Sequence, residues 1–443
     1  MKKHEAYFRI KELFAEIRSK RIRDKARKAR DKSSWSRQRK MPLSDILICT
    51  LAKKGLSAIM ELRHFFQAAR KVGQTVSKQD YLKQRRKLNP EVFRELNRNY
   101  LGRFYGSEEP EEWLGYLVLA VDGSRAEIPD SPENRKAYGA SRNQYGNAVA
   151  RANISGLHDV LNGFMLDIGI HQYRDSEIKE AKANIKALKR IVGDRPVLIL
   201  FDRNYASLEF MDFLEKAGVK YLIRLHKDDY KAEVGGMQGT DGEVELAYTK
   251  ARLRELKKKE PKRAAELEGQ GSGRVRIVKA RLDSGEEAAF MTNLQEGACG
   301  DISGLYRKRW SIEKKYHTLK NKMKVESVTG KASIYVKQDF WAQMLVYNIV
   351  QDLIMEAEVR AAEEAKKKRL KYEVRINENI AIGLFKEKLI QVMTEEDDCL
   401  KDEMFRGLIA DMEENIVPVR ESKSAPRRWK YFNKYKCNQK PSF

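Results

Sequence analysis

The sequence has only four cysteines and six histidines in 443 residues, and neither type is spaced to bind zinc. The cysteines lie far apart, at Cys49, Cys299, Cys399 and Cys437. No CxxC pair exists, which excludes a zinc ribbon and a disulfide-stabilised secreted scaffold. The histidines without ligand spacing include His158, His171 and His226. The sequence therefore predicts free thiols and no zinc site.

Long hydrophobic runs are also absent. No apolar stretch approaches the ~20 residues of a membrane span. The first residues, MKKHEAYFRIKELF, lack the continuous apolar core of a signal peptide. Hydrophobic residues make up 42% and charged residues 34% of the chain, as in a globular protein with a highly charged surface. We expect a cytoplasmic protein of two to four domains, at ~150 residues for each domain.

Acidic residues are scarce at the two ends of the chain. Residues 1–40 hold 16 Lys and Arg against 5 Asp and Glu, and residues 420–443 hold 8 against 1. The ends thus carry +18 of the net charge of +24. A globular body with two basic arms fits a polyanion, because Lys and Arg that contact phosphates release counterions. Charge alone favours a nucleic acid without separating DNA from RNA, and a solvated surface without such a partner is the alternative.

Apolar residues at three- and four-residue spacing predict helices in the first 110 residues. The segments PLSDILICTLAKKG and SAIMELRHFFQAARKVG are two examples, and a third begins at Ser77 and is broken at Pro90. Short apolar runs then alternate with helical segments, which predicts an α/β sheet with helices on its faces. The expected strands are residues 116–121, 163–170, 197–201 and 219–226, and the expected helices are residues 176–190 and 207–217.

Residues 227–300 interrupt this alternation. They contain Gly235-Gly236, a charged helical run, a GQGSG turn and the strand-like segments RVRIVKARL and AAFMTNL. We interpret them as a subdomain inserted in the α/β unit. After Gly300 the pattern predicts a helix from Ser303 to about Val325 and a long helix near residues 340–357.

Two aspartates occupy equivalent places in this pattern. Asp122 ends the strand at residues 116–121 before a turn at Gly123, and Asp202 ends the strand at residues 197–201. Ligands collect at the carboxyl ends of strands in open α/β sheets, and adjacent strands lie ~5 Å apart, so the two carboxylates can share one metal ion. Mg²⁺ prefers such oxygen ligands and keeps water and phosphates around it. For either aspartate alone, capping of a turn is the simpler explanation.

The expected helix after Gly300 carries a polar stripe. Its members are Tyr306, Arg309, Glu313 and Lys320. Spacings of three, four and seven residues place them within an arc of ~60° at ~100° per residue. An apolar stripe runs beside it at Ile312, Tyr316, Leu319 and Met323. If the apolar stripe packs on the sheet, the polar stripe lines the edge of that contact; a surface ion pair between Arg309 and Glu313 is the alternative.

This stripe resembles a known signature. Tyr-x2-Arg-x3-Glu-x6-Lys is similar to the YREK signature of the insertion-sequence-four family of bacterial transposases, a branch of the DDE superfamily. The segment YRKRWSIEKKYHTLK resembles that family's YRxRWxIExxFxxLK. MTNL before it, DRNYAS around Asp202 and VDGS around Asp122 resemble the family's other motifs in the same order. The resemblance covers roughly residues 40–350.

The resemblance implies a catalytic role for three carboxylates. Asp122, Asp202 and Glu313 would be the metal-binding triad that holds two Mg²⁺ ions, for which Mn²⁺ can substitute. The ions would act as a clamp, one activating the attacking water or 3′-hydroxyl and one stabilising the leaving oxygen. The enzyme would hydrolyse a phosphodiester at the end of the element and then join the free 3′-hydroxyl to target DNA.

The resemblance also implies DNA contacts in the same helix. Tyr306, Arg309 and Lys320 would contact the phosphates near the cut, since a planar guanidinium suits bidentate phosphate binding. Trp310 is a further candidate DNA contact, although packing in the core is the favoured role for it. His317, one turn after Glu313, is expected on the surface rather than on a metal.

The implied fold is α/β, with a ribonuclease-H-like catalytic core, a β-rich insertion within it, and helical N-terminal and C-terminal regions. The expected domains are a basic DNA-binding region, the core in two segments, the insertion and a helical region with a basic tail, at residues 1–110, 111–226 with 301–330, 227–300 and 331–443. The expected partners are double-stranded DNA, both element ends and target, and a second copy of the chain. The expected location is the bacterial cytoplasm at the nucleoid, without a membrane.

One feature departs from the family. Some relatives cut through a DNA hairpin and hold a flipped base with a tryptophan of the insertion. Residues 227–300 contain no Trp, which leaves Tyr230 and Tyr248 as aromatic faces for that step. Three other functions remain open at this stage: an inactive relative that only binds DNA, a ribonuclease-H-like nuclease that does not join strands, and a structural RNA-binding protein.

Overall fold

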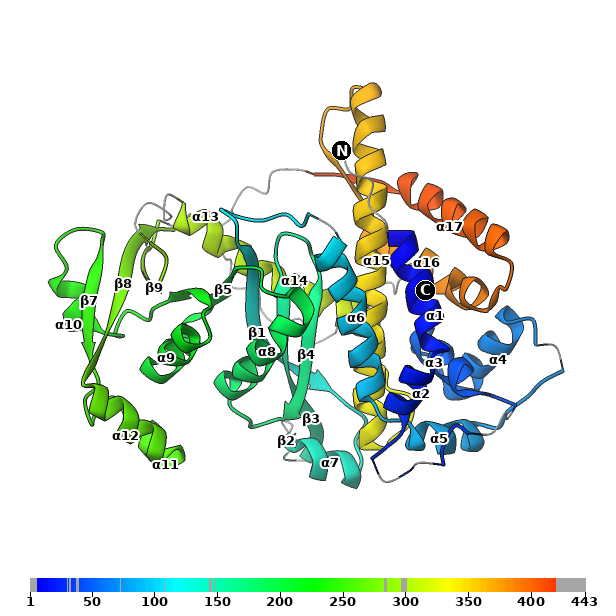
Figure 1. The fold of residues 1–443 in the computed structure, drawn as a ribbon, viewed down its shortest axis with the longest axis horizontal. Helices are drawn as coiled ribbons and strands as arrows, with labels where there is room; N and C mark the ends of the chain where they lie inside the picture. The colour runs from blue at the N-terminus through cyan, green and yellow to red at the C-terminus, as the bar shows by residue number, and fades with distance from the viewer. Residues whose placement is uncertain are drawn as a thin grey trace.

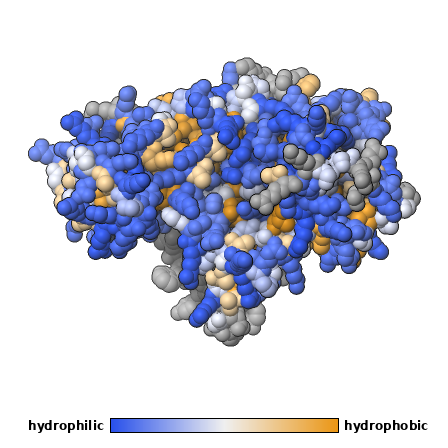
Figure 2. All heavy atoms as spheres, turned by 60° about the horizontal axis from the view of Figure 1, so that its bottom comes forward, coloured by the Kyte–Doolittle hydropathy of each residue, from blue (hydrophilic) through white to orange (hydrophobic). Residues whose placement is uncertain are grey.

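The computed structural model describes residues 6–29, 31, 33–36, 40–71, 73–107, 109–142, 146, 148–282, 285–295 and 301–419. The basic tail expected at residues 420–443 lies outside this part of the chain. Among the described helices, none is long and apolar enough to cross a membrane. The fold is a mixed α/β structure in which helices cover a large sheet (Figure 1). Its surface is mostly hydrophilic on the face in Figure 2, where hydrophobic residues show only in small separate areas.

The sheet has the strand order β2-β3-β1-β5-β6-β9-β8-β7, with β4 also paired to β3. Its strands are β1 (Leu117–Glu127), β2 (Ala140–Arg142), β3 (Ala148–Asp159), β4 (Met165–Gln172), β5 (Val197–Phe201), β6 (Lys220–Arg224), β7 (Asp241–Ala247), β8 (Ser272–Arg281) and β9 (Glu287–Thr292). β1 pairs in parallel with β5, and β5 with β6. The other pairs are antiparallel. Continuous apolar runs explain the central strands, because β5 is buried along its whole length.

The expected strands are confirmed as β1, β4, β5 and β6, with two differences. β1 does not end at Asp122 but continues to Glu127, because β3 pairs with it from Leu119 onward while its parallel pairing with β5 ends at Ala120. β3 itself was not predicted. Its sequence AVARANISGLHD mixes small, polar and apolar residues, so it gives no apolar run, although the pairing with β1 and β4 buries most of it.

The segment after β6 extends the same sheet. β9 pairs with β6, β8 with β9 and β7 with β8, so the insertion continues the edge of the sheet (Figure 1). The two strands expected here are β8 and β9, and β7 is a third. The helices of this segment are α10 (Lys231–Gly236), α11 (Arg254–Lys259) and α12 (Pro261–Gln270). The division of the chain into domains stays a prediction.

The first 107 residues are helical in their described part, as predicted. The helices are α1 (Ala6–Ile17), α2 (Lys20–Ala26), α3 (Leu43–Leu51), α4 (Ala58–Ala68), α5 (Lys78–Lys87) and α6 (Glu91–Ser107). Ser77 caps α5 by accepting a hydrogen bond from the backbone N–H of Asp80, 3.1 Å away. Residues 6–26, however, are not a free basic arm. Ile10, Leu13 and Ile22 are fully buried, because the apolar spacing of α1 and α2 places one face of each helix in the core.

The long helix α15 (Ser333–Lys367) runs between the sheet and α6 on one side and the other N-terminal helices and the C-terminal helices on the other (Figure 1). The C-terminal elements are β10 (Val374–Ile376), α16 (Glu378–Thr394), α17 (Asp398–Glu413) and β11 (Ile416–Pro418). Asn348 of α15 accepts a hydrogen bond from the N–H of Met165 and donates one to its carbonyl, at 2.9 and 2.7 Å. Trp341 donates to the carbonyl of Ile168 at 2.7 Å. These bonds fix α15 against β4.

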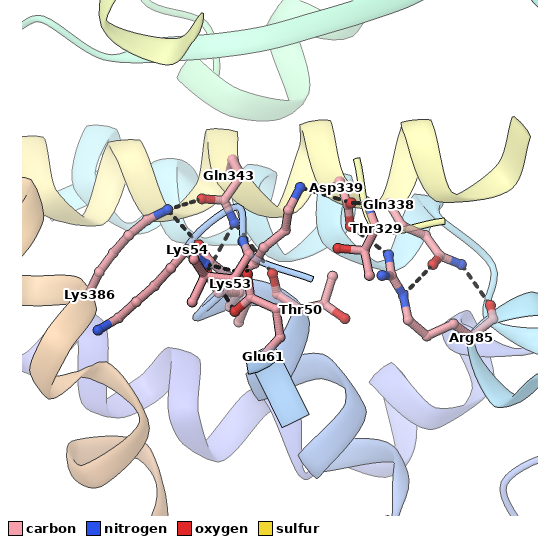
Figure 3. A network of polar contacts seen from close by, with 12 residues as sticks. Thr50, Lys53, Lys54, Glu61, Arg85, Thr329, Gln338, Asp339, Gln343 and Lys386 are labelled. Carbon is pink, nitrogen blue, oxygen red and sulfur yellow. Dashed lines mark hydrogen bonds and ion pairs between the residues drawn. The ribbon is translucent and has the colours of Figure 1, made fainter. Parts of the chain in front are cut away.

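On its other side α15 presents buried carboxylates to the N-terminal helices (Figure 3). Asp339 accepts hydrogen bonds from Lys53 Nζ at 2.9 Å, Arg85 Nη2 at 2.6 Å and the backbone N–H of Thr329 at 2.6 Å. Burial opposes its ionisation, but the charges of Arg85 and Lys53 outweigh burial and lower the pKa of Asp339. Asp352, farther along α15, is bound in the same way by Arg9 and Tyr100. Three N-terminal segments, α1, the loop after α3, and α5, are therefore joined to α15 by compensated buried charges.

We predict that Asp339→Ala strongly destabilises the fold. The substitution leaves Lys53 and Arg85 buried without their counter-charge, which typically costs about 3–5 kcal/mol of unfolding free energy. A lower thermal unfolding midpoint, followed by circular dichroism, is the expected result. Asp194→Ala is the control, since its side chain is 87% exposed and its loss is expected to leave the midpoint unchanged. Equal midpoints for the two variants would contradict the role of Asp339.

Candidate active site

Asp122 lies within β1, at the point where the parallel pairing with β5 has just ended. It pairs with Gly156 of β3, so both residues point to the same face of the sheet. That face is occupied by Tyr316, whose hydroxyl donates a 2.7 Å hydrogen bond to the carbonyl of Asp122. A Cβ at Gly156 would lie 2.7 Å from this hydroxyl, so a glycine is needed there. The pairing with Gly156 and the hydrogen bond from Tyr316 together fix the backbone at Asp122.

Asp202 follows the last residue of β5, as predicted, and begins the short helix η1 (Arg203–Tyr205). Its Oδ1 accepts a 2.8 Å hydrogen bond from the backbone N–H of Asn204. This capping bond fixes the carboxylate just beyond the end of the strand, next to the strand that carries Asp122. The helix α9 (Leu208–Lys216) follows, as expected for residues 207–217.

The expected signature helix is present from Ile302 to Lys322, but it changes its winding along the way. It consists of α13 (Ile302–Arg307), the 3₁₀ turn η2 (Lys308–Trp310), α14 (Ser311–His317) and the π-helical turn η3 (Thr318–Lys322). The apolar stripe is buried as predicted, at Ile312, Tyr316, Leu319 and Met323. The helix therefore packs through this stripe, and the polar stripe lies along the edge of the contact.

Arg309 joins two of the three predicted catalytic carboxylates. Its Nη1 lies 3.5 Å from Asp122 Oδ2, and its Nη2 lies 3.1 Å from Glu313 Oε1. The side chain of Arg309 is only 11% exposed, whereas that of Glu313 is 35% exposed. The pair at i,i+4 is thus more than a surface ion pair, because the same guanidinium reaches across to β1. Arg309 therefore holds Glu313 of the helix and Asp122 of the sheet near each other.

The charge of Asp122 depends on all of these neighbours. The pKa of Asp122 is raised to about 6, mainly by burial and to a lesser extent by the carboxylates of Asp202 and Glu313, while Arg309 and the N–H of Gly123 lower it. Asp122 thus interacts electrostatically with both Asp202 and Glu313, although the three acids come from three separate segments of the chain. Their carboxylate oxygens do not all lie within 4.8 Å of one another in this structure.

Tyr306 and Lys320, two of the predicted phosphate contacts, are partly withdrawn from solvent. The Tyr306 ring packs on Phe290 with centroids 4.9 Å apart, and Arg309 lies over its face at 5.9 Å. Lys320 donates to Ser124 Oγ at 2.7 Å and to the carbonyl of Arg125 at 2.6 Å. Lys320 therefore joins η3 to β1 just after Asp122, in addition to any contact with DNA.

Trp310 is 44% exposed, so the favoured expectation that it packs in the core is wrong. It precedes the buried Ile312 by two residues, or ~200° of helix, and therefore faces away from the apolar stripe. In the insertion, Tyr248 is buried and Tyr230 is half-buried, with the guanidinium of Arg252 5.3 Å from the Tyr230 ring centre. Tyr248 is thus covered in this structure, whereas Tyr230 is partly accessible.

Two residues near the site were missed by reasoning from the sequence. Glu177, at the start of α8 (Glu177–Val192), approaches from the opposite face of the sheet, with its Oε1 3.0 Å from the Cβ that a side chain at Gly123 would have. Burial and then the charge of Asp202 raise the pKa of Glu177. Tyr316 was assigned only to the apolar stripe. Neither role has a local sequence signal, because each depends on a contact between distant segments.

The donor set fits a hard divalent cation. Asp122, Asp202 and Glu313 offer only carboxylate oxygens, the ligands that Mg²⁺ and Mn²⁺ prefer. A cation at this edge would offset both the burial and the repulsion that raise the pKa of Asp122. The roles of the individual residues stay predictions.

Comparisons with known proteins find similarity to transposases. The family described as Transposase DDE domain matches residues 113–349, a range that contains all of the expected site residues. The chain is 24% identical over 273 residues to the Transposase InsG for insertion sequence element IS4 of Escherichia coli (strain K12), over 60% of this chain and 59% of that protein. It thus spans about three fifths of that relative. A solved structure, the piggyBac transposase synaptic complex with hairpin DNA, covers 96% of this chain and 87% of its own, at 10% identity and a TM-score of 0.42.

The family match extends over more than half of the chain, from the residues before β1 to the middle of α15. The order of the motifs, the similarity to the IS4 transposase and this match agree with the resemblance seen in the sequence. The chain therefore belongs to the family of transposases with a DDE domain.

Proposed function

We propose that this chain is a DNA transposase of an insertion sequence, with Asp122, Asp202 and Glu313 as its catalytic triad. The observation that carries the proposal is the convergence of Asp122 and Glu313 on Arg309, with Asp202 beside them, in a chain of this family. The acids come from two adjacent parallel strands and from a helix that packs across one of them. Such an arrangement suits two-metal phosphoryl chemistry on a DNA backbone.

We propose that the strands in the order β4-β3-β1-β5-β6 form a ribonuclease-H-like core. In this part of the sheet only β3 runs against its neighbours. The first and fourth strands along the chain within this core, β1 and β5, are adjacent and carry the two aspartates. The insertion after β6 separates them from the segment that carries Glu313.

The residues of the site would have different roles. Asp122, Asp202 and Glu313 would hold two Mg²⁺ ions, or Mn²⁺ in their place, which when bound polarise the phosphodiester and activate the attacking oxygen. Arg309 neutralises two of these acids here, and it would turn to a DNA phosphate once cations compensate them. Tyr316 donates a hydrogen bond to the carbonyl of Asp122, and Lys320 donates one to Ser124, two residues farther along β1. Tyr306 and exposed Trp310 would border the DNA on the same helix.

The substrates in this proposal are the ends of the element and a target duplex. The chain would cleave at the element end and join the resulting 3′-hydroxyl to the target. Two copies would act together to pair two ends, and the protein would act at the nucleoid. The high positive charge of the sequence supports the DNA partner, because it favours phosphate contacts.

Glu313→Ala is expected to keep DNA binding and to abolish cleavage with Mg²⁺. Removal of a catalytic ligand typically lowers kcat by more than ~10³-fold, while phosphate contacts elsewhere maintain affinity. Binding is measured by fluorescence anisotropy on DNA with the element's own ends, and cleavage and joining are followed on gels. Glu363→Ala, an exposed acid of α15, is the control that should retain both activities. Equal loss of binding and cleavage in Glu313→Ala would contradict the metal role, and cleavage without joined product in the wild type would indicate a nuclease.

Mn²⁺ binding is expected to weaken as the pH falls below about 6. A metal ligand must be ionised, and the pKa of Asp122 is raised to about 6, so affinity should fall about tenfold for each pH unit below that value. Arg309→Gln removes the charge that lowers this pKa and should shift the profile to higher pH. Electron paramagnetic resonance of free Mn²⁺ measures the affinity, and the component lost in Asp202→Ala is assigned to the triad. An affinity that is constant from pH 7 to pH 5 would show that Asp122 is not a ligand.

Exposed basic residues of α2 and the turn after it are expected to contact DNA. Lys20, Arg23 and Lys28 are exposed. Their joint replacement by Ala should weaken binding and reduce the salt dependence by about 0.9 in the slope of log K against log salt for each lost phosphate contact. The control replaces the exposed Lys257, Lys258 and Lys259 of α11, which removes the same charge elsewhere. An unchanged slope in the first variant, or an equal change in the control, would exclude a specific contact at α2.

A further inference from the structure

The end of β4 and the first turn of α8 bring three metal-ligand side chains together, away from the triad. His171 is the second-last residue of β4, Asp175 lies in the following turn, and Glu180 is in α8. One ligand atom of each lies within 4.8 Å of the others. Among the described residues, no other group of three His, Cys, Asp or Glu side chains meets this condition. The sequence spacing did not predict the group, because a strand, a turn and a helix each contribute one member.

Glu180 is the member that most needs a partner. Its side chain is 0% exposed, and neither carboxylate oxygen has a hydrogen-bond partner. Polar atoms that are buried without a hydrogen bond are costly, and a buried carboxylate normally has a cation or several donors around it. The two carboxylate oxygens of Glu180 therefore lack the partner that a buried carboxylate needs.

The spacing of the two groups fits an ion between them. His171 Nδ1 lies 3.8 Å from Glu180 Oε1, which is too far for a hydrogen bond. Two ligand atoms that are each about 2.1 Å from one ion lie at most about 4.2 Å apart. Half-buried Asp175 would approach by less than about 1 Å to complete the set. Gly169 makes room for the imidazole, since a Cβ there would overlap the His171 ring.

We propose that His171, Asp175 and Glu180 bind one divalent transition-metal ion of the Zn²⁺ type, separately from the triad. Two carboxylates and an imidazole suit Zn²⁺ or Mn²⁺, whereas Mg²⁺ rarely takes a nitrogen ligand. Three protein ligands leave a further position for water. Because Glu177 lies one turn before Glu180 and faces Gly123, the ion would fix the start of α8 beside Asp122. Its role is to hold this helix in place, without contact with the reacting DNA.

A protonated Glu180 is the competing explanation. Burial raises the pKa of Glu180 to about 8, so the metal-free carboxyl can be neutral near pH 7. A neutral carboxyl still carries a donor and an acceptor, however, and neither oxygen is within hydrogen-bond reach of a partner. Protonation alone would leave the burial of these atoms uncompensated.

The test measures Zn²⁺ binding to the full chain after chelator treatment. Elemental analysis gives the stoichiometry, and competition with a chromophoric chelator gives the Kd, both in the wild type and in Asp202→Ala, where the triad is disabled. We expect one Zn²⁺ per chain that persists in Asp202→Ala. Glu180→Gln and His171→Gln should each weaken binding by about tenfold or more. Glu356→Gln is the matched control, a half-buried helix glutamate with an unpartnered oxygen that belongs to no ligand group among the described residues.

Two results would overturn the site. One is the absence of bound Zn²⁺ in Asp202→Ala, and the other is a Kd in Glu180→Gln equal to that of the wild type. If Glu180→Gln fails to fold, X-ray absorption at the zinc edge of Asp202→Ala decides the question. A shell with one imidazole and otherwise oxygen supports the site, and a shell without imidazole excludes it.

Discussion

Buried charge on α15 is the constraint on which the arrangement of the molecule depends. Asp339 and Asp352 have no exposed surface, and a buried carboxylate is tolerated only when a cation reaches it. Arg9 of α1, Arg85 of α5 and Lys53 in the loop after α3 supply those cations from segments hundreds of residues away in sequence. The N-terminal helices must therefore dock on α15. Since α15 is also bonded to β4, their docking position and that of the sheet are set by the same helix.

In the candidate active site a cation also reaches the carboxylates, but it compensates their charge less completely. Arg309 compensates Asp122 and Glu313 only in part. Arg85 and Lys53 outweigh burial at Asp339 and lower its pKa, whereas at Asp122 burial and the neighbouring carboxylates outweigh Arg309 and raise the pKa. An uncompensated charge at the edge of a sheet is a structural cost. Such a cost is typical of a functional site whose charges are compensated only when a cation and a phosphate bind.

The acidic residues that approach β1 come from two helices, one on each face of the sheet. Alternation along β1 sends Asp122 toward α14 and a side chain at position 123 toward α8. Glu313 therefore approaches on one face, while Glu177 and the group around Glu180 lie on the other. Hydrogen bonds from Asn184 of α8 to Ser155 of β3 hold that second helix on the sheet. The geometry at Asp122 depends on both helices, and a change in the position of α8 would be transmitted through Gly123.

The sequence by itself determined the parts that rest on local patterns. Continuous apolar runs located β5 and the buried part of β1, helical spacing located α3 to α6, and the order of short motifs indicated the family and singled out Asp122, Asp202 and Glu313 as candidates. Only the tertiary structure decided what depends on partners far away in the chain. β3 is a strand because β1 and β4 pair with it, the apolar face of α1 is directed to α15 because Arg9 reaches Asp352, and Trp310 is exposed because the neighbouring stripe takes the core. His171 and Glu180 meet only because a strand and a helix pack together, and a pattern read along the chain holds no information on such a meeting.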